Sequence, residues 1–424
     1  MTVDRRDFLR RVGMAASAAP FVSPEWTVAD PDQLFTAGRF TEADRGYARI
    51  LRHDPANAHA AAQRGYIAVL SNEFERAERF LTQALSLAPD DVFSRRQLAD
   101  SFVRQDRFAR AVPLLRQTGN DADTAAAEQY AAVLAAGTPY QVHGAAATRV
   151  PFVGIEPYPY VEASLNGGPP KLFYLDTGST SPGFTTEVAE ELGLRAVASM
   201  TAQLGGGHTF TLYLGVLESF RLGDIEIRNV PVSWSDVARP APPEGPAPVG
   251  AFGTVLFYHF LTTMDYAGRA LVLRGKSTRL HPRPGTTVLP LWLAATHFPC
   301  TLGSLNDLGP MVVSMDTGGN GIGVVTTEEI AAQAGIAVDH AHPTTFNGVE
   351  VYPIAPGTIS LGDAVGRHVP GIAGPIFQPD RYRFHTIANF THEFFKPYAI
   401  TFDFDGMHFY LTPAVRQFTN FTKL

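Results

Sequence analysis

Two Asp-Thr-Gly tripeptides are the residues of this sequence best suited to chemistry. Asp176 lies in KLFYLDTGSTSPG and Asp316 lies in MVVSMDTGGNGIG, each after an apolar run typical of a β-strand and before a glycine-rich turn. Two carboxylates that are held close together cannot both ionise easily, so they share one proton. One carboxylate then acts as a base and the other as an acid, which is enough to activate a water molecule for hydrolysis without a metal.

The surroundings of the two tripeptides are duplicated as well. Leu222-Gly223-Asp224 matches Leu361-Gly362-Asp363 at an offset of 139. A single Asp-Thr-Gly is most often an ordinary turn, because Asp and Gly are turn residues. A pair in matching surroundings is harder to explain as a coincidence. We therefore interpret residues 150–280 and 285–415 as two copies of one β-rich unit.

These motifs resemble those of the aspartic protease superfamily, the pepsin-like and retropepsin-like enzymes, over roughly residues 145–415. The resemblance implies an all-β domain with two lobes, in which each lobe supplies one catalytic aspartate, Asp176 or Asp316. It also implies a β-hairpin flap in each lobe. The candidate flap and cleft residues are Gly205, Gly206 and Gly207 in the first lobe and Asn347 and Gly348 in the second.

The family also has an apolar-apolar-glycine element beneath each catalytic turn. In the first lobe this element is Ala251-Phe252-Gly253. In the second lobe its position stays open, because the offset between the copies leads to Thr391 or His392. Ile387-Ala388-Asn389 and the more distant Ile372-Ala373-Gly374 are the alternatives.

The residues after each aspartate have expected roles in holding the pair together. By the resemblance, Thr177 and Thr317 hydrogen-bond across to the opposite turn and keep the carboxylates from drifting apart. Gly178 and Gly318 suit a tight turn in which a Cβ atom would crowd the opposing lobe.

The two turns differ at the next position. By the resemblance, Ser179 supports Asp176 from outside, whereas Gly319 offers no hydroxyl to Asp316. This difference could shift the shared proton or weaken catalysis. We expect no cofactor and no metal, and no dimer is required to complete a site whose halves lie in one chain.

A 34-residue period precedes the β-rich part. Phe40, Phe74 and Phe108 follow this spacing, as do alanines in the same units. The pattern resembles the tetratricopeptide repeat, in which small residues let paired helices approach and aromatic residues fill the groove between pairs. It implies an all-α helical array over residues 29–137, followed by a linker over residues 138–149. The array could recruit a protein partner or the substrate, and a helical bundle without a binding role is the alternative.

The N-terminus, MTVDRRDFLRRVGMAASAAPFV, has the features of an export signal. Arg5-Arg6 followed by Asp7 and an apolar pair fits the twin-arginine pattern, and Ala16-Ser17-Ala18 fits a cleavage site. We interpret residues 1–18 as a twin-arginine-type signal peptide, which predicts a periplasmic or secreted protein. A short basic helix on a cytoplasmic protein is the alternative.

Composition excludes several other classes. The chain of 424 residues has 34 Lys+Arg against 41 Asp+Glu, which gives no electrostatic basis for binding nucleic acid. One cysteine, Cys300, excludes an intrachain disulfide and a cysteine-rich zinc site. No apolar run has the length of a membrane-spanning helix.

The sequence thus predicts two parts, helical repeats followed by a bilobal all-β aspartic protease domain. The predicted activity is endopeptide hydrolysis of a peptide or protein substrate by a water molecule held between Asp176 and Asp316. The competing prediction is a catalytically inactive adaptor that keeps the protease fold and binds peptides.

Overall fold

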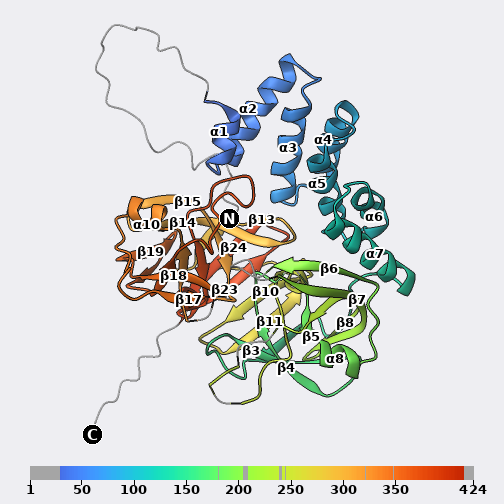
Figure 1. Cartoon of the computed structure of the whole chain (residues 1–424), viewed down its shortest axis with the longest axis vertical. Helices are drawn as coiled ribbons and strands as arrows, with labels where there is room; N and C mark the ends of the chain where they lie inside the picture. Colours follow the sequence, from blue (N-terminus) through green and yellow to red (C-terminus); the bar gives the residue numbers. More distant parts are fainter. Residues whose placement is uncertain are drawn as a thin grey trace.

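The computed structural model describes residues 29–179, 181–203, 209–237, 241–243, 245–319, 321–346 and 348–414. The predicted signal peptide and four of the candidate flap residues, Gly205, Gly206, Gly207 and Asn347, lie outside this description. Helices come first along the chain and strands dominate after residue 137, as the sequence predicts (Figure 1).

The helical array consists of antiparallel helix pairs. The three phenylalanines of the 34-residue period each begin the second helix of a pair. A Cβ atom at Gly65 would lie 2.5 Å from Cγ of Leu81, so glycine allows the central pair to pack closely. The helices are α1 (Pro31–Thr36), α2 (Phe40–His53), α3 (Ala58–Leu70), α4 (Phe74–Leu87), α5 (Val92–Val103), α6 (Phe108–Arg116) and α7 (Asp121–Ala136).

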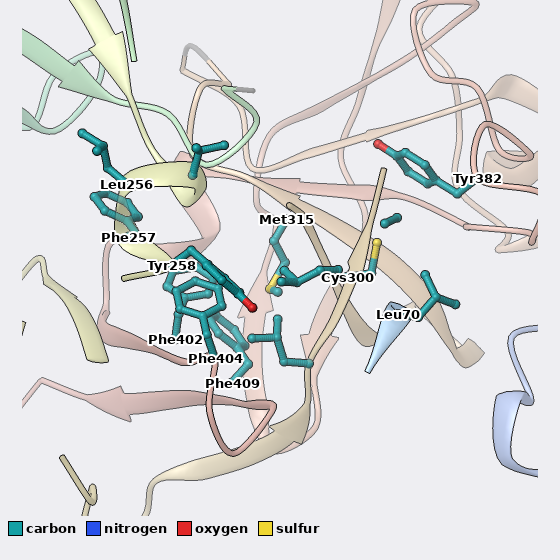
Figure 2. Packing of buried hydrophobic residues seen from close by; sticks show 14 of the residues in the cluster. Leu70, Leu256, Phe257, Tyr258, Cys300, Met315, Tyr382, Phe402, Phe404 and Phe409 are labelled. Atoms are coloured by element: carbon teal, nitrogen blue, oxygen red, sulfur yellow. The ribbon is translucent and has the colours of Figure 1, made fainter. Parts of the chain in front are cut away.

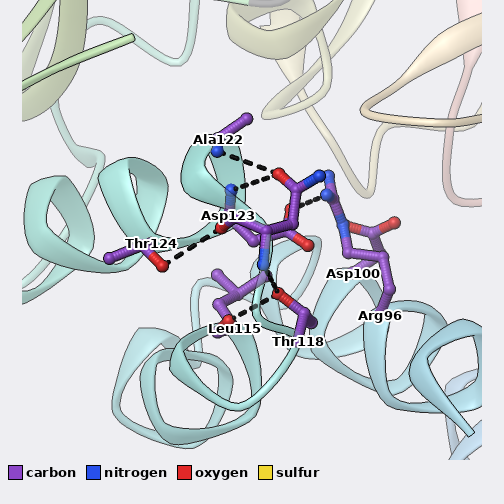
Figure 3. Close-up of polar contacts among 8 residues, drawn as sticks. Arg96, Asp100, Leu115, Thr118, Ala122, Asp123 and Thr124 are labelled. Atoms are coloured by element: carbon purple, nitrogen blue, oxygen red, sulfur yellow. Dashed lines mark hydrogen bonds and ion pairs between the residues drawn. The ribbon is translucent and has the colours of Figure 1, made fainter.

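Side-chain caps and ion pairs fix the end of the array. The Asn120 side chain accepts hydrogen bonds from the backbone N–H groups of Ala122 and Asp123 and so begins α7. Arg96 of α5 pairs with Asp100 on its own helix and with the buried Asp123 of α7 (Figure 3). These contacts join the start of α7 to α5.

The first lobe is an eight-stranded sheet in the order β1-β8-β5-β9-β4-β3-β7-β6, in which β7 and β8 also pair. Its parallel pair β4–β9 leads into the turn that contains Asp176. The strands are β1 (Gln141–Gly144), β3 (Tyr160–Leu165), β4 (Pro170–Leu175), β5 (Gly183–Thr185), β6 (Ala198–Gln203), β7 (Thr209–Leu222), β8 (Ile225–Ser235) and β9 (Gly250–Phe252), with helices α8 (Thr186–Glu191) and α9 (Thr254–Phe257).

The second lobe repeats the pairing of the first. Parallel β15–β22 corresponds to β4–β9, and antiparallel β16–β22 corresponds to β5–β9. Its order is β17-β18-β21-β16-β22-β15-β14-β19-β20, with β13 beside β14. The strands are β13 (Trp292–Ala294), β14 (Phe298–Leu305), β15 (Leu308–Asp316), β16 (Val324–Thr326), β17 (Thr344–Phe346), β18 (Val349–Ile354), β19 (Thr358–Leu361), β20 (Ala364–Arg367), β21 (Gly371–Ala373) and β22 (Asn389–Thr391), with helices α10 (Glu328–Gln333) and α11 (His392–Phe395).

A six-stranded sheet joins the lobes in the order β12-β24-β23-β10-β11-β2. At its centre, equivalent strands of the two copies pair antiparallel, and the Oγ1 atoms of Thr263 and Thr401 lie 2.8 Å apart. The strands are β2 (Ala147–Pro151), β10 (Phe260–Asp265), β11 (Ala270–Gly275), β12 (Thr287–Pro290), β23 (Tyr398–Asp403) and β24 (His408–Pro413).

Residues 138–149, expected to form a linker, contain β1 and the start of β2. Strand β1 pairs with β8, and β2 pairs with β11, which adds them to two different sheets. Each is short and has a partner strand far along the chain, so local sequence gives only a weak signal for it.

One apolar core runs from the helical array into the second lobe. Figure 2 shows Leu70 of α3 on one side of Met315, and Tyr258, Phe402 and Phe404 of the β domain on the other. The ring of Phe40 lies 5.0 Å from both Trp292 and Phe384 between ring centroids. The array therefore packs directly on the β domain.

Polar contacts fasten the array to both lobes. Buried Arg104 donates from Nη2 to the carbonyl oxygens of Leu293 (2.8 Å) and Ala295 (2.9 Å) in the second lobe. Buried Gln129 of α7 donates from Nε2 to the carbonyl oxygens of Gly215 (2.9 Å) and Val232 (2.8 Å) in the first lobe. The helix faces that carry these residues are thus covered by the β domain.

Within the described part of the chain, no helix is both long enough and apolar enough to cross a membrane.

Candidate active site

The two aspartates stand where parallel strand pairs end. Asp176 directly follows β4, and Asp316 is the last residue of β15. Strand β4 pairs in parallel with the short strand β9, and β15 pairs in parallel with the short strand β22. The duplicated topology therefore presents both carboxylates from equivalent positions of the two lobes.

Reciprocal hydrogen bonds between Thr177 and Thr317 join the two turns. The Thr177 N–H donates to Oγ1 of Thr317 (3.1 Å), and the Thr317 N–H donates to Oγ1 of Thr177 (3.0 Å). Each hydroxyl then donates across the interface, from Thr177 to the carbonyl oxygen of Met315 (3.2 Å) and from Thr317 to that of Leu175 (3.0 Å). Both threonines are buried, so these four bonds fix the turns against one another.

The glycines of the two turns show how closely the carboxylates approach. A Cβ atom at Gly178 would lie 2.7 Å from Oδ2 of Asp316, and one at Gly318 would lie 2.8 Å from Oδ1 of Asp176. Each carboxylate therefore reaches the turn of the opposite lobe, and only glycine leaves room for it there.

Backbone N–H groups of the same glycines bind the carboxylates. Gly178 donates to Oδ1 of Asp176 and Gly318 donates to Oδ1 of Asp316, both at 2.8 Å. Such donors favour the ionised form of a carboxyl group, whereas a neighbouring carboxylate disfavours it. These two bonds hold each carboxylate within its own turn.

The strand register identifies the element beneath each turn. In the first lobe Leu175 pairs with Phe252, and a Cβ atom at Gly253 would overlap the carbonyl group of Asp176. In the second lobe Met315 pairs with Phe390, and Asp316 pairs with Thr391. Of the open alternatives, the position of Gly253 is thus taken by Thr391. Ile372 and Ala373 belong to β21 instead.

Thr391 explains the glycine at position 319. A Cβ atom at Gly319 would overlap the side chain of Thr391, which occupies the space beneath the second turn. In the first lobe the bulk is exchanged, because Ser179 stands on the turn and Gly253 on the strand. The two lobes thus carry the larger residue of this pair on different elements, the turn in the first lobe and the strand in the second.

The hydroxyl groups at these positions steady their turns from different elements. The Ser179 hydroxyl donates to the carbonyl oxygen of Ser181 (2.7 Å), and that of Thr391 donates to the carbonyl oxygen of Ile322. The backbone N–H of Ser179 also donates to the Asp176 carbonyl oxygen at 3.0 Å. Support of the Asp176 carboxylate by the Ser179 hydroxyl stays a prediction of the resemblance.

An aromatic cluster that sequence reasoning missed lies on the Asp176 side of β4. Alternation along the strand places Tyr174 on the same face as Asp176. The ring of Tyr158 stacks on Tyr174 with centroids 4.9 Å apart, and Tyr160 lies against it. Burial, the neighbouring tyrosines and the charges of Asp176 and Asp316 together raise the pKa of the Tyr158 phenol well above its usual range. The sequence did contain a signal for this neighbour, because residues two apart on a strand, such as 174 and 176, lie on the same face.

Only part of the candidate flaps can be placed. Strands β6 and β7 pair antiparallel, with Ala198 opposite Leu214 and Gln203 opposite Thr209. They flank the segment of the chain that contains the three glycines. In the second lobe Gly348 follows the β17 strand with a φ of +79°, a conformation that favours glycine, and leads into β18. Both candidate segments thus lie between antiparallel strands.

One group among the described residues has the spacing of metal ligands: Glu156, His392 and Glu393. However, Lys396 Nζ lies 2.6 Å from Glu156 Oε1 and 2.5 Å from Glu393 Oε1. His392 Nε2 lies 2.8 Å from the carbonyl oxygen of Ile155. These contacts already satisfy the group, so we assign no metal to it.

One comparison with known families matches part of this region. Residues 161–254, which include Asp176 and the Ala251–Gly253 element, match the model of the aspartyl protease family. The matched region ends before Asp316. A search of curated protein sequences found no match.

Two solved structures resemble parts of the chain at low similarity. Basic 7S globulin from soybean is 10% identical, with a TM-score of 0.39, over 65% of this chain and 96% of the globulin. A mutant Thermobaculum terrenum O-GlcNAc transferase is 15% identical, with a TM-score of 0.23, over 25% of this chain and 21% of the transferase.

Proposed function

We propose that this protein is an aspartic endopeptidase whose dyad is Asp176 and Asp316. The observation that carries the proposal is the close approach of each carboxylate to the opposite glycine, beneath reciprocal threonine hydrogen bonds. Carboxyl groups held in this way can share one proton and bind one water molecule between them.

The proposed reaction needs only the dyad and water. The ionised carboxylate takes a proton from the water, whose oxygen attacks the peptide carbonyl carbon, while the protonated carboxyl group gives its proton to the carbonyl oxygen. The tetrahedral diol then loses a proton to one carboxylate as the other protonates the amine nitrogen. The C–N bond breaks, a carboxylic acid and an amine leave, and the dyad again holds one proton.

The alternative is an inactive adaptor that binds peptides in the same cleft. The observation that favours it is the departure of the second turn from the first, with Gly319 and Thr391 in place of Ser179 and Gly253. We prefer the enzyme because this departure leaves the threonine and glycine contacts of the dyad symmetrical.

A test of the enzyme uses carboxylate-to-amide changes on the full chain. Purified wild type, Asp176→Asn and Asp316→Asn are incubated with a denatured protein mixture from about pH 3 to 7, with and without pepstatin. We expect pepstatin-sensitive cleavage by wild type and a loss of at least about a thousandfold in each variant, the scale of removing a member of a catalytic set. Asp363→Asn, on an exposed loop, is the matched control. Wild type without cleavage would leave the adaptor as the better explanation.

Recruitment of a partner or substrate by the helical array is a separate proposal. The faces that carry Tyr66, Arg104 and Gln129 are bonded to the β domain, so recruitment has to use the opposite, outward surface of the array. Pull-down with the full chain before and after charge reversal on α2, α4 and α6 tests it.

Export is proposed on the N-terminal motif alone, from Arg5-Arg6 to the Ala16-Ser17-Ala18 site. N-terminal sequencing of the protein from the periplasm or the medium is expected to give a start near Ala19. Recovery of chains that begin at Met1 from the cytosol alone would contradict export.

A further inference from the structure

A buried histidine follows the strand that lies beside Asp316. His392 is the first residue of α11 and comes directly after Thr391, so it stands where Thr254 stands in the first lobe. Thr254 stays within its own lobe, where its hydroxyl donates to the carbonyl oxygen of Thr177 (2.8 Å). His392 has no exposed surface and reaches into the other lobe instead.

The contacts of His392 define its hydrogen-bonding roles. Nε2 lies 2.8 Å from the carbonyl oxygen of Ile155, and Nδ1 lies 3.4 Å from the hydroxyl of Tyr266. A carbonyl oxygen only accepts, so Nε2 carries the proton and Nδ1 is left to accept from Tyr266. The neutral imidazole thus links the second lobe to a loop of the first.

That loop, residues 153–159, is fastened to the strand of Asp176. Pro159 accepts a hydrogen bond from the Leu175 N–H at 2.9 Å, one residue before the aspartate. Tyr158 stacks on Tyr174 beside the same strand. A shift of Ile155 would therefore be passed to the backbone that positions Asp176.

A continuous path of contacts then connects the two aspartates below the threonine pair. It runs from Asp316 to its register partner Thr391, through the peptide bond to His392, and on to Ile155 and the loop 153–159. The ion pair between Lys396 and Glu156 ties the same loop to α11 at the surface. His392 is the buried member of this connection and the one adjacent to the dyad.

We propose that His392 is a positioning residue of the dyad, which holds the strand of Asp316 and the loop 153–159 at a fixed separation. This proposal rests on the proposed endopeptidase function for its kinetic consequences, but its structural consequence does not require activity. Misplacement of a reacting group by about 1 Å can cost about a hundredfold in rate.

The test compares two substitutions that differ in hydrogen bonding. His392→Gln places an amide N–H near the position of Nε2 and can still donate to Ile155, whereas His392→Leu fills the space without a donor. We expect His392→Leu to lower kcat at least about tenfold with KM changed less than about threefold, and His392→Gln to recover most of the loss. His297→Leu is the matched control, because it removes another buried imidazole whose Nδ1 makes no hydrogen bond.

Amide hydrogen exchange provides a second measurement that does not need turnover. We expect His392→Leu, but not His297→Leu, to speed hydrogen exchange at the Leu175 and Thr177 amides at least about tenfold. The Leu175 N–H donates to Pro159 in the loop that His392 contacts, and the Thr177 N–H donates to Thr317 beside Asp316. Unchanged kcat and exchange in His392→Leu, or equal effects in His297→Leu, would overturn the role of His392. If wild type itself lacks activity, the endopeptidase proposal fails and exchange alone decides the positioning role.

Discussion

Gly319 and Thr391 share one space beneath the turn of Asp316, in which a Cβ on the first would overlap the side chain of the second. In the first lobe the corresponding residues are Ser179 and Gly253, and a Cβ at Gly253 would overlap the Asp176 carbonyl group. The two lobes therefore carry the larger residue of this pair on different elements.

This relationship predicts non-additive substitutions. Gly319→Ser alone forces overlap with Thr391 and is expected to destabilise the protein by about 1–3 kcal/mol, the usual cost of overpacking. The pair Gly319→Ser with Thr391→Gly recreates the arrangement of the first lobe and should recover most of that loss. Urea unfolding of the wild type, both single variants and the pair gives the interaction energy. Additive effects would contradict the shared space.

The threonine pair predicts a strong effect of a small change. Thr317→Val keeps the shape of the side chain but removes the acceptor of the Thr177 N–H and the donor to the Leu175 carbonyl oxygen. A buried group left without its partner costs about 1–3 kcal/mol. We expect a stability loss of this size and a lower kcat, measured by denaturation and cleavage of a peptide substrate. Thr317→Ser, which keeps the hydroxyl, is the control and should stay close to wild type.

His392 predicts how stability depends on pH. Burial lowers the pKa of this histidine from its usual 6.5 to about 4, and the charge of Lys396 adds to the effect. The bond to the Ile155 carbonyl oxygen and the charge of Glu156 oppose it; Tyr266 and Glu393 also face it. The unfolded chain therefore binds a proton between about pH 6.5 and 4 that the folded chain does not.

The sign follows from this difference in bound protons. Stability falls as pH drops from about 6.5 to 4, by up to about 3 kcal/mol for this group, because one pKa unit corresponds to about 1.4 kcal/mol. Urea unfolding at pH 7, 5.5 and 4 should show a shallower decline in His392→Gln than in wild type. Equal slopes would show that His392 does not titrate in this range.

The junction of the array with the second lobe predicts a cost for losing one arginine. Arg104 is buried, and its guanidinium donates to the carbonyl oxygens of Val69, Leu293 and Ala295. Arg104→Met removes the guanidinium donor from all three carbonyl oxygens, although those of Val69 and Ala295 keep backbone donors in Asn72 and His297. We expect a cost of about 1–3 kcal/mol, measured by denaturation. Arg110→Met, which removes an exposed guanidinium beside Phe102 and Glu78, is the control with an expected change below about 1 kcal/mol.

The sequence was sufficient to predict features that are local or duplicated. The 34-residue spacing predicted the helix pairs because each phenylalanine begins the same helix of its pair. The two Asp-Thr-Gly turns were recognisable because each is followed by matching residues. The order of a helical part and an all-β part follows from the change in composition near residue 137.

Features that depend on contacts between distant segments could not be predicted. The assignment of Thr391 needed the strand register, since the offset between the copies varies from 138 to 140 and residue type gives no help. The bond between His392 and Ile155 joins residues 237 positions apart. The strands at 141–144 and 147–151 likewise form only because partners more than 70 residues away lie beside them.

The covered inner side of the helices also limits how this polypeptide can be divided. A cut after Gly137 would separate Phe40 and Tyr66 on one fragment from their contacts on the other, which include Trp292 and Phe384. Both fragments would expose this aromatic surface to water, and the β fragment would also lose the Arg104 and Gln129 donors to its backbone carbonyls. We therefore expect the chain to unfold as one cooperative unit, and fragments cut at this boundary to aggregate.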